Sequence, residues 1–150
     1  MARFTPEEAA AIAAIQHLVH QWGHELDEGE GLGLVDSGIL SDDCRYNVGG
    51  SWREGHAGVA AFYAQRKQRL DADGGGPVMR HVISNVRTKF RSDHHAEVHF
   101  LLVFFAKAGA PPFDGYCDPL AVADVRMECR RDPAGEWRIS LFDSTQVFRR

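Results

Sequence analysis

One histidine stands in a segment whose other residues are typical of a β-strand. Residues 77–86 read PVMRHVISNV, with β-branched side chains at Val82, Ile83 and Val86. Such side chains favour strands, and a strand of a globular domain buries at least one face. His81 is therefore an ionisable ring placed close to a core. A neutral imidazole can accept a proton from a substrate, so His81 is the first candidate for a general base.

A catalytic histidine needs a partner that fixes its tautomer, and Asp27 is the candidate for that role. Asp27 lies at the end of the first predicted helix, on the flank of its apolar stripe, where its carboxylate can point toward a cavity. A carboxylate on one ring nitrogen leaves the other free as a base and stabilises the imidazolium that forms. Periodicity by itself favours a plainer interpretation, in which Asp27 is solvated and His81 is a hydrogen-bonded core residue.

Two more polar side chains are candidates for a substrate pocket, and each has a structural alternative. Tyr46 shares a strand face with Cys44 and Val48. A buried tyrosine normally finds a hydrogen-bond partner whether or not it binds a substrate. Asp124 alternates with Arg126 along a later strand, which also fits a solvated face with a row of charges.

The remaining ionisable side chains have plainer interpretations. His99 and Asp143 fall on apolar strand faces, where His99 is ordinarily a satisfied core residue and Asp143 can pair with an arginine. His17, His20 and His24 have a helical spacing that could chelate a metal, but no acidic ligand stands at the HExxH spacing and no cysteine is near. A solvated or subunit-facing helix side is favoured for these three, and no metal site is expected.

The first helix, which must carry Asp27, has a complete start signal. Thr5, Pro6 and Glu8 supply an N-cap, a proline in the first turn and a capping-box glutamate. Apolar side chains then recur at alternating spacings of three and four, which predicts one buried stripe: Ile12, Ile15, Val19, Trp22 and Leu26. The acidic and glycine-rich residues 27–31 end the helix.

The remaining elements predict an α+β fold. A short second helix is predicted over 32–40 and a third over 59–70, with short strands near 44–48 and 52–56 between them. Four longer strands follow, near 79–91, 96–107, 118–130 and 136–148. Helices followed by a run of antiparallel strands are typical of the α+β class. The stretch 96–105 is almost continuously apolar, so it is expected to be a central strand covered on both faces.

The bulk composition is typical of a globular protein and predicts neither nucleic acid nor a membrane as a partner. The 150 residues predict a single domain over 1–150, with 44% hydrophobic and 25% charged residues. A net charge of −4 gives no electrostatic reason to expect nucleic acid or an anionic membrane. There is no long apolar run and no signal-peptide pattern, and three scattered cysteines do not suggest a disulfide framework. A cytoplasmic location is expected.

The order of these elements and four short motifs resemble the nuclear transport factor 2-like (NTF2-like) superfamily, specifically its SnoaL-like, scytalone dehydratase-like branch. The motifs are WGHELDEG at 22–29, the helix start from Gly55 to Phe62 and Tyr63, RHVISN at 80–85, and GEWR at 135–138. The resemblance implies a cone-shaped, cystatin-like fold. In it a curved antiparallel sheet wraps a long N-terminal helix, with two further short helices.

The resemblance also implies roles for individual residues. In scytalone dehydratases and hexachlorocyclohexane dehydrochlorinases, an aspartate at the end of the first helix orients the strand histidine that is the base of an elimination. By position these are Asp27 and His81. The strand tyrosine that donates a hydrogen bond to the substrate carbonyl is similar to Tyr46. The substrate-binding residues implied for the pocket are Asp124, His99, Trp52, Phe62 and Phe104.

Together these observations predict a small lyase that catalyses a dehydratase-type elimination without a cofactor. The expected substrate is a hydrophobic, cyclic hydroxy-ketone or a polyketide- or aromatic-like compound. The sequence contains no P-loop and no dinucleotide-binding fingerprint. An isomerase or cyclase of the same fold is an alternative. Another is a non-catalytic ligand-binding or assembly domain related to the small subunits of aromatic-ring dioxygenases. A homo-oligomer, trimer or dimer, is expected.

Overall fold

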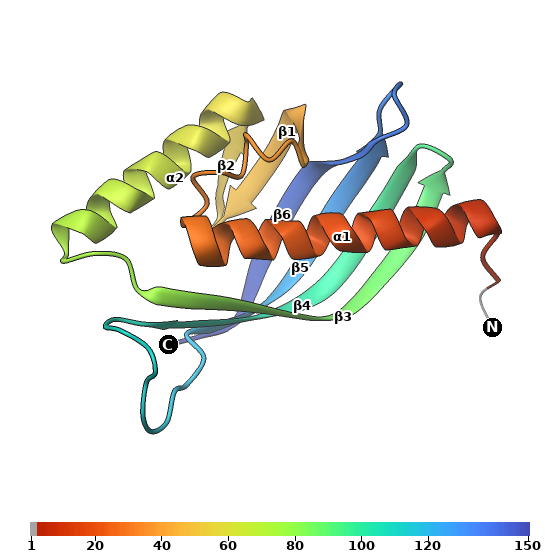
Figure 1. The fold of residues 1–150 in the computed structure, drawn as a ribbon. Coiled ribbons are helices and arrows are strands. Elements are labelled where there is room, and N and C mark those ends of the chain that lie inside the picture. Colours follow the sequence, from red (N-terminus) through yellow and green to blue (C-terminus); the bar gives the residue numbers. More distant parts are fainter. Residues whose placement is uncertain (1–2) are drawn as a thin grey trace.

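A long helix lies along the concave face of a curved six-stranded sheet in the computed structural model, which describes residues 3–150 (Figure 1). A second helix flanks one end of the sheet. The elements follow in this order: α1 (Pro6–Gly29), β1 (Leu40–Val48), β2 (Ser51–Glu54), α2 (Gly55–Ala72), β3 (Val78–Ser92), β4 (His95–Lys107), β5 (Ala121–Arg131) and β6 (Trp137–Arg149). No helix within residues 3–150 has the length and apolar character needed to cross a membrane.

The sheet is mixed, which corrects the prediction of an antiparallel sheet. Its strand order is β2-β1-β6-β5-β4-β3. β1 runs parallel to β6, and every other neighbouring pair is antiparallel. The parallel pair arises because the last strand returns beside the first after the β3–β5 meander. β3 lies at the edge of the sheet, so one side of its backbone has no strand partner.

The predicted second helix is wrong, since residues 30–38 form consecutive turns and residues 3–150 contain two helices rather than three. Glu30 ends α1 in the left-handed conformation with φ 53°, and Gly31 follows with φ 82°. Two successive left-handed residues turn the chain away from the helix axis. A Cβ at Gly31 would also collide with the ring of Tyr63, so glycine is required at this close approach.

The start of α1 is confirmed in detail. The backbone N–H of Glu8 donates to Oγ1 of Thr5 at 3.1 Å, and the backbone N–H of Thr5 donates to the Glu8 carboxylate at 2.8 Å. This capping box satisfies two otherwise unpaired donors. It fixes the start of the helix whose far end carries Asp27. The buried residues of α1 are Ile15, Leu18, Val19, Trp22, Gly23 and Leu26.

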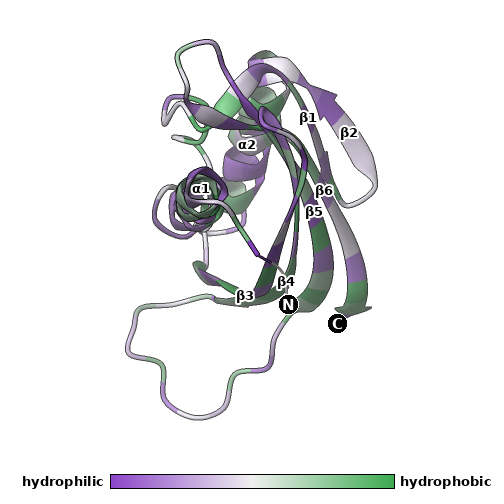
Figure 2. Cartoon of the chain, turned by 90° about the vertical axis from the view of Figure 1, so that its right-hand side faces the viewer, coloured by the Kyte–Doolittle hydropathy of each residue, from purple (hydrophilic) through white to green (hydrophobic). Residues whose placement is uncertain are grey.

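The core lies between α1 and the concave face of the sheet, and the strands alternate accordingly (Figure 2). On β4 the buried positions are the even-numbered residues from Ala96 to Leu102, and on β5 they are the odd-numbered residues from Ala123 to Cys129. β3 changes its alternation at a bulge, where Asn85 adopts a left-handed φ of 55°. The bulge lets His81 and, beyond it, Val86 face the same helix.

Candidate functional site

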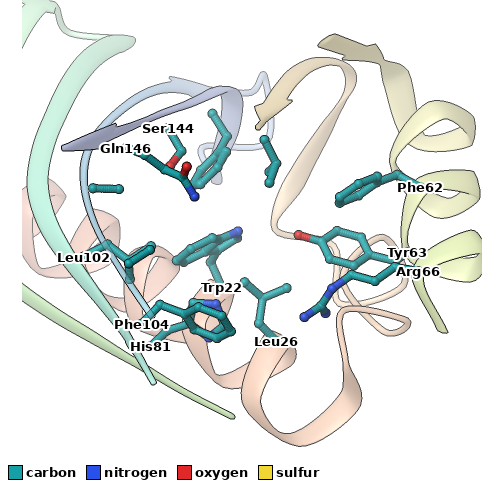
Figure 3. Close-up of a pocket in the computed structure, with 14 residues that line it drawn as sticks. Trp22, Leu26, Phe62, Tyr63, Arg66, His81, Leu102, Phe104, Ser144 and Gln146 are labelled. Carbon is teal, nitrogen blue, oxygen red and sulfur yellow. The ribbon is translucent and has the colours of Figure 1, made fainter. Parts of the chain in front are cut away.

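A cavity of about 230 Å³ opens between the C-terminal half of α1, the helix α2 and the sheet (Figure 3). Most of its wall is apolar, and the large side chains in it are Trp22, Leu26, Phe62, Leu102, Phe104 and Phe142. Five polar side chains interrupt this wall: Tyr63, Arg66, His81, Ser144 and Gln146. A mainly apolar pocket with a few converging polar groups is the usual form of a small-molecule site.

Asp27 and His81 meet at one end of this cavity, although 54 residues separate them in the sequence. Oδ1 of Asp27 lies 2.6 Å from Nδ1 of His81. The backbone N–H of His81 also donates to this carboxylate, with the nitrogen 3.0 Å from Oδ1 and 3.1 Å from Oδ2. That N–H belongs to the unpaired side of edge strand β3, so the aspartate also satisfies the backbone there. With Nδ1 held as a donor, Nε2 is the ring nitrogen left for a substrate.

The helix reaches the histidine because a glycine lies where the two elements touch. Gly23 is buried on α1, and a Cβ there would lie 3.2 Å from Cδ1 of Ile83 on β3. A methyl group at this position would fit only if the side chain of Ile83 gave way by a few tenths of an ångström. One turn later along α1, Asp27 is therefore within hydrogen-bonding reach of His81.

His81 is held between aromatic rings in a largely dry environment. Its ring stacks on Phe104 with centroids 4.6 Å apart and meets the edge of Trp22 at 5.7 Å. Burial lowers the pKa of His81 below its ordinary value. The hydrogen bond that the ring donates to Asp27 works against that shift, and the positive charge of Arg66 adds to it. The imidazole is therefore neutral near pH 7, which is the state a general base requires.

A hydrogen-bonded pair of tyrosines lies at the opposite side of the cavity from His81. Tyr46 is fully buried and accepts a hydrogen bond from Nε1–H of Trp22 at 2.7 Å. Its hydroxyl lies 2.7 Å from the hydroxyl of Tyr63. Tyr63 lines the cavity, whereas Tyr46 lies behind it. The structure therefore places the tyrosine of the second helix, rather than that of the first strand, where it can touch a ligand.

The order of donors in this chain is set by Trp22. The indole can only donate, so Tyr46 accepts from it, and the hydroxyl of Tyr63 is the partner that the structure offers for the buried proton of Tyr46. The proton of Tyr63 is then free for a ligand. Burial raises the pKa of Tyr63 to about 12, partly offset by the hydrogen bond from Tyr46, and raises the pKa of Tyr46 well above its ordinary value. Both tyrosines are neutral donors over the whole physiological range.

Arg66 brings a positive charge to the same cavity. It lies on α2 three residues after Tyr63, so the two side chains share one face of the helix. Within residues 3–150 the guanidinium makes its side-chain hydrogen bond to Sδ of Met79, at 3.1 Å. A thioether is a weak acceptor, so most of the five N–H donors of Arg66 are left for other partners.

Three of the predicted pocket residues do not reach this cavity. Asp124 is exposed on the convex face of β5, and His99 points to the same face of the sheet, where Nε2 lies 2.7 Å from Glu97. Trp52 is 42% exposed on β2 and lies under the guanidinium of Arg45. The other two, Phe62 and Phe104, do line the cavity.

The remaining candidates also lie elsewhere. Asp143 accepts a hydrogen bond from the amide of Asn47 at 2.8 Å. His17, His20 and His24 are exposed along the outer side of α1. No group of three histidine, cysteine or acidic side chains in residues 3–150 is arranged to hold a metal ion.

Sequence reasoning missed four polar residues of the cavity: Tyr63, Arg66, Ser144 and Gln146. The first two had a usable signal, because a tyrosine and an arginine three residues apart interrupt the apolar side of a predicted helix. Ser144 and Gln146 lie two and four residues after the buried Phe142 on β6, so by alternation they share its face of the sheet. This part of the strand is partly buried at Ser144 and exposed at Gln146.

A family model described as the SnoaL-like domain matches residues 7–143. No curated protein matches the sequence. An NTF2-like protein with a cystatin-like fold from Novosphingobium aromaticivorans is 23% identical with a TM-score of 0.70, covering 97% of this chain and 92% of its own. A proposed scytalone dehydratase from the same species is 12% identical with a TM-score of 0.74, covering 97% and 89%.

A third structure, from Catenulispora acidiphila in complex with S-DNPA, is 17% identical with a TM-score of 0.73 and covers 92% of this chain and 94% of its own. At these identities the likenesses establish the fold, which is NTF2-like with a mixed sheet. They do not by themselves carry an activity.

Proposed function

The chain belongs to the SnoaL-like domain family, and we propose that it is a lyase that eliminates water from a hydrophobic, cyclic hydroxy-ketone without a cofactor. One observation carries the proposal. The Asp27 carboxylate lies 2.6 Å from Nδ1 of His81, and His81 lines the cavity. A positioned, neutral imidazole with one free nitrogen is the equipment for removing a proton from carbon.

The first step is proton abstraction at the carbon next to the substrate carbonyl. Nε2 of His81 takes the proton, and the electrons of the broken C–H bond move onto the carbonyl oxygen as an enolate. Asp27 stabilises the imidazolium that forms. Tyr63 donates its hydroxyl proton in a hydrogen bond to the enolate oxygen, a role that the family resemblance implied for Tyr46.

The second step expels the hydroxyl group from the neighbouring carbon. The enolate electrons return to form the carbon–carbon double bond as the C–O bond breaks. His81 gives its proton to the departing oxygen, so the leaving group is water and the base is regenerated. No electrons enter or leave the system, and no co-reactant is needed.

The walls of the cavity favour a compact and mainly apolar substrate. About 230 Å³ is less than the roughly 300–1,000 Å³ of pockets that hold drug-sized ligands, which suits one or two rings. Trp22 and Phe104 frame the base and exclude water from it. Excluding water strengthens each polar interaction of the enolate.

A second candidate function is ligand binding without chemistry. The neighbouring structure from Catenulispora acidiphila is a complex with a small molecule, S-DNPA, which supports a binding role for this fold. In that case the hydrogen bonds of Asp27 would serve to fix the edge of β3. An isomerase would share the first step and return the proton to a different carbon.

The test is a panel of cyclic β-hydroxy-ketones incubated with the protein in deuterated water and followed by proton NMR. We expect exchange of the proton next to the carbonyl together with formation of the unsaturated ketone. Both signals should disappear in His81→Gln and persist in His20→Gln, which changes an exposed histidine on α1. Exchange without loss of water would instead indicate an isomerase. Tight binding with neither signal would indicate a ligand-binding protein.

A further inference from the structure

We propose that the substrate carries a carboxylate group, which the guanidinium of Arg66 binds. This inference rests on the proposed function, because it concerns the same cavity. It specifies that the otherwise apolar ligand is an acid. The charge of the cavity wall is not neutralised within the described part of the chain. Among residues 3–150, Arg66 is the one permanently charged cation in the cavity wall, and no ion pair includes it.

The guanidinium of Arg66 is an incompletely satisfied cation. Its side-chain hydrogen bond goes to the sulfur of Met79, and none of the ion pairs of residues 3–150 includes it. A cation beside apolar walls is costly unless an anion accompanies it. The side chain is half-buried at the wall of the cavity, so an anion that enters the cavity can reach it.

Two acidic residues near the cavity do not neutralise this charge. Asp27 is committed to the ring and backbone of His81. Glu30, at the end of α1, has a buried carboxylate oxygen with no hydrogen-bond partner, yet it does not lie within ion-pair distance of Arg66. The positive charge therefore faces the ligand space and acts on the pKa of His81.

Tyr63, whose proton goes to the enolate oxygen in the proposed elimination, is the neighbour of Arg66 on α2. It lies one helical turn before Arg66, and Figure 3 shows the guanidinium beside its ring at the α2 side of the cavity. With the Tyr46 proton donated to Tyr63, the proton of Tyr63 is free for the enolate oxygen. A guanidinium can donate to both oxygens of a carboxylate at once, so Arg66 can bind such a group without the proton of Tyr63.

This anchor lies across the cavity from the base. Figure 3 places Arg66 and Tyr63 on one side, with His81 stacked on Phe104 on the other. A carboxylate held at α2 leaves the apolar body of the ligand against Trp22 and Leu26, both in the cavity wall. The inferred ligand is therefore a compact ring acid, with the reacting carbon facing Nε2.

The test compares a ring acid with its neutral isostere, using 2-naphthoate and 2-naphthamide in isothermal titration calorimetry near neutral pH. We expect the wild-type protein to bind the carboxylate about tenfold more tightly than the amide, the size of one charge-assisted hydrogen bond. Arg66→Gln should abolish this preference, and Arg66→Lys should retain part of it. The matched control is Arg69→Gln, an exposed arginine on the same helix, which should keep the full preference.

Equal binding of the two probes by the wild-type protein would overturn the inference, and so would failure of the carboxylate to bind at millimolar concentration. Neither result depends on the folding of a variant. Retention of the preference in a folded Arg66→Gln protein would also overturn it. The measurement involves no turnover, so it is independent of the lyase proposal. His81→Gln is expected to keep the carboxylate preference even though it removes catalysis.

Discussion

The carboxylate of Asp27 holds His81 at two points, the ring nitrogen Nδ1 and the backbone N–H. The ring contact fixes the tautomer, and the backbone contact fixes the edge strand from which the ring projects. One side chain at the end of a helix thus sets both the protonation state and the position of the candidate base. The two contacts can be separated experimentally, because a substitution at Asp27 can keep a hydrogen bond to the backbone and weaken the interaction with the ring.

Asp27→Asn keeps the shape of the side chain and removes its charge. Its amide oxygen can still accept one hydrogen bond, but the imidazolium loses its stabilising anion and the tautomer is no longer enforced. We expect kcat/KM for the elimination to fall by about 100-fold or more, with a cooperative folded state retained. Steady-state kinetics and circular dichroism would measure the two effects. Asp143→Asn, which changes a carboxylate outside the cavity, should leave kcat/KM near the wild-type value.

The lowered pKa of His81 predicts the pH dependence of activity. The base works only when neutral, so kcat/KM should be constant at neutral pH and fall only below the ordinary histidine value of 6.5. NMR titration of the His81 ring would give the pKa directly. A pKa above 6.5 would contradict this account, because it would mean that Asp27 outweighs burial.

The same shift has a consequence for stability. Below pH 6.5 the unfolded chain binds a proton at His81, while the folded protein does not until the pH reaches its lower folded-state pKa. The unfolded state therefore binds more protons in that window, and the contribution of His81 to the free energy of unfolding falls as the pH falls through it. Urea unfolding of the wild-type protein and His81→Gln at several pH values would isolate this contribution.

Arg66 contributes to the low pKa of His81 through its charge. Arg66→Gln removes that charge, so the pKa of His81 should rise relative to the wild-type protein. Arg69→Gln, on the exposed side of α2, should change it much less because solvent screens exposed charges. NMR titration of the three proteins makes the comparison. An unchanged pKa in Arg66→Gln would mean that the guanidinium points away from the cavity in solution.

The pairing of Asp27 with His81 was predicted from the family resemblance, since periodicity by itself favoured a solvated aspartate and a core histidine. Asp27 ends a well-marked helix, and His81 interrupts an apolar strand. The wrong face assigned to His99 has a local cause. Residues 96–105 are apolar at both odd and even positions, so hydropathy does not tell which set faces the helix. The end of α1 was predicted, but the helix predicted over 32–40 was wrong, because the chain continues in consecutive turns over 30–38 after the left-handed Glu30 and Gly31.

The two tyrosines are expected to separate stability from activity. Tyr46→Phe leaves the indole N–H of Trp22 buried without a partner, which should lower the free energy of unfolding by about 1–3 kcal/mol. Tyr63→Phe removes the hydroxyl that faces the ligand, so it should lower kcat/KM about tenfold or more with a smaller effect on stability. Urea unfolding and steady-state kinetics on both variants test this. A larger loss of activity in a stable Tyr46→Phe protein would reverse the assignment.

Gly31 connects the end of α1 to the ligand site, because it lies against the ring of Tyr63. Alanine there requires a left-handed backbone, with φ of 82°, and brings a methyl group into the tyrosine ring. We expect Gly31→Ala to lower the free energy of unfolding by about 1–3 kcal/mol and to weaken ligand binding by displacing Tyr63. Gly29→Ala is the matched control, since nothing lies within 4 Å of the added methyl group. It should be neutral or stabilising by up to about 1 kcal/mol, because alanine favours the helix over glycine. Similar losses in both variants would show that the helix end, rather than the contact with Tyr63, is sensitive to substitution.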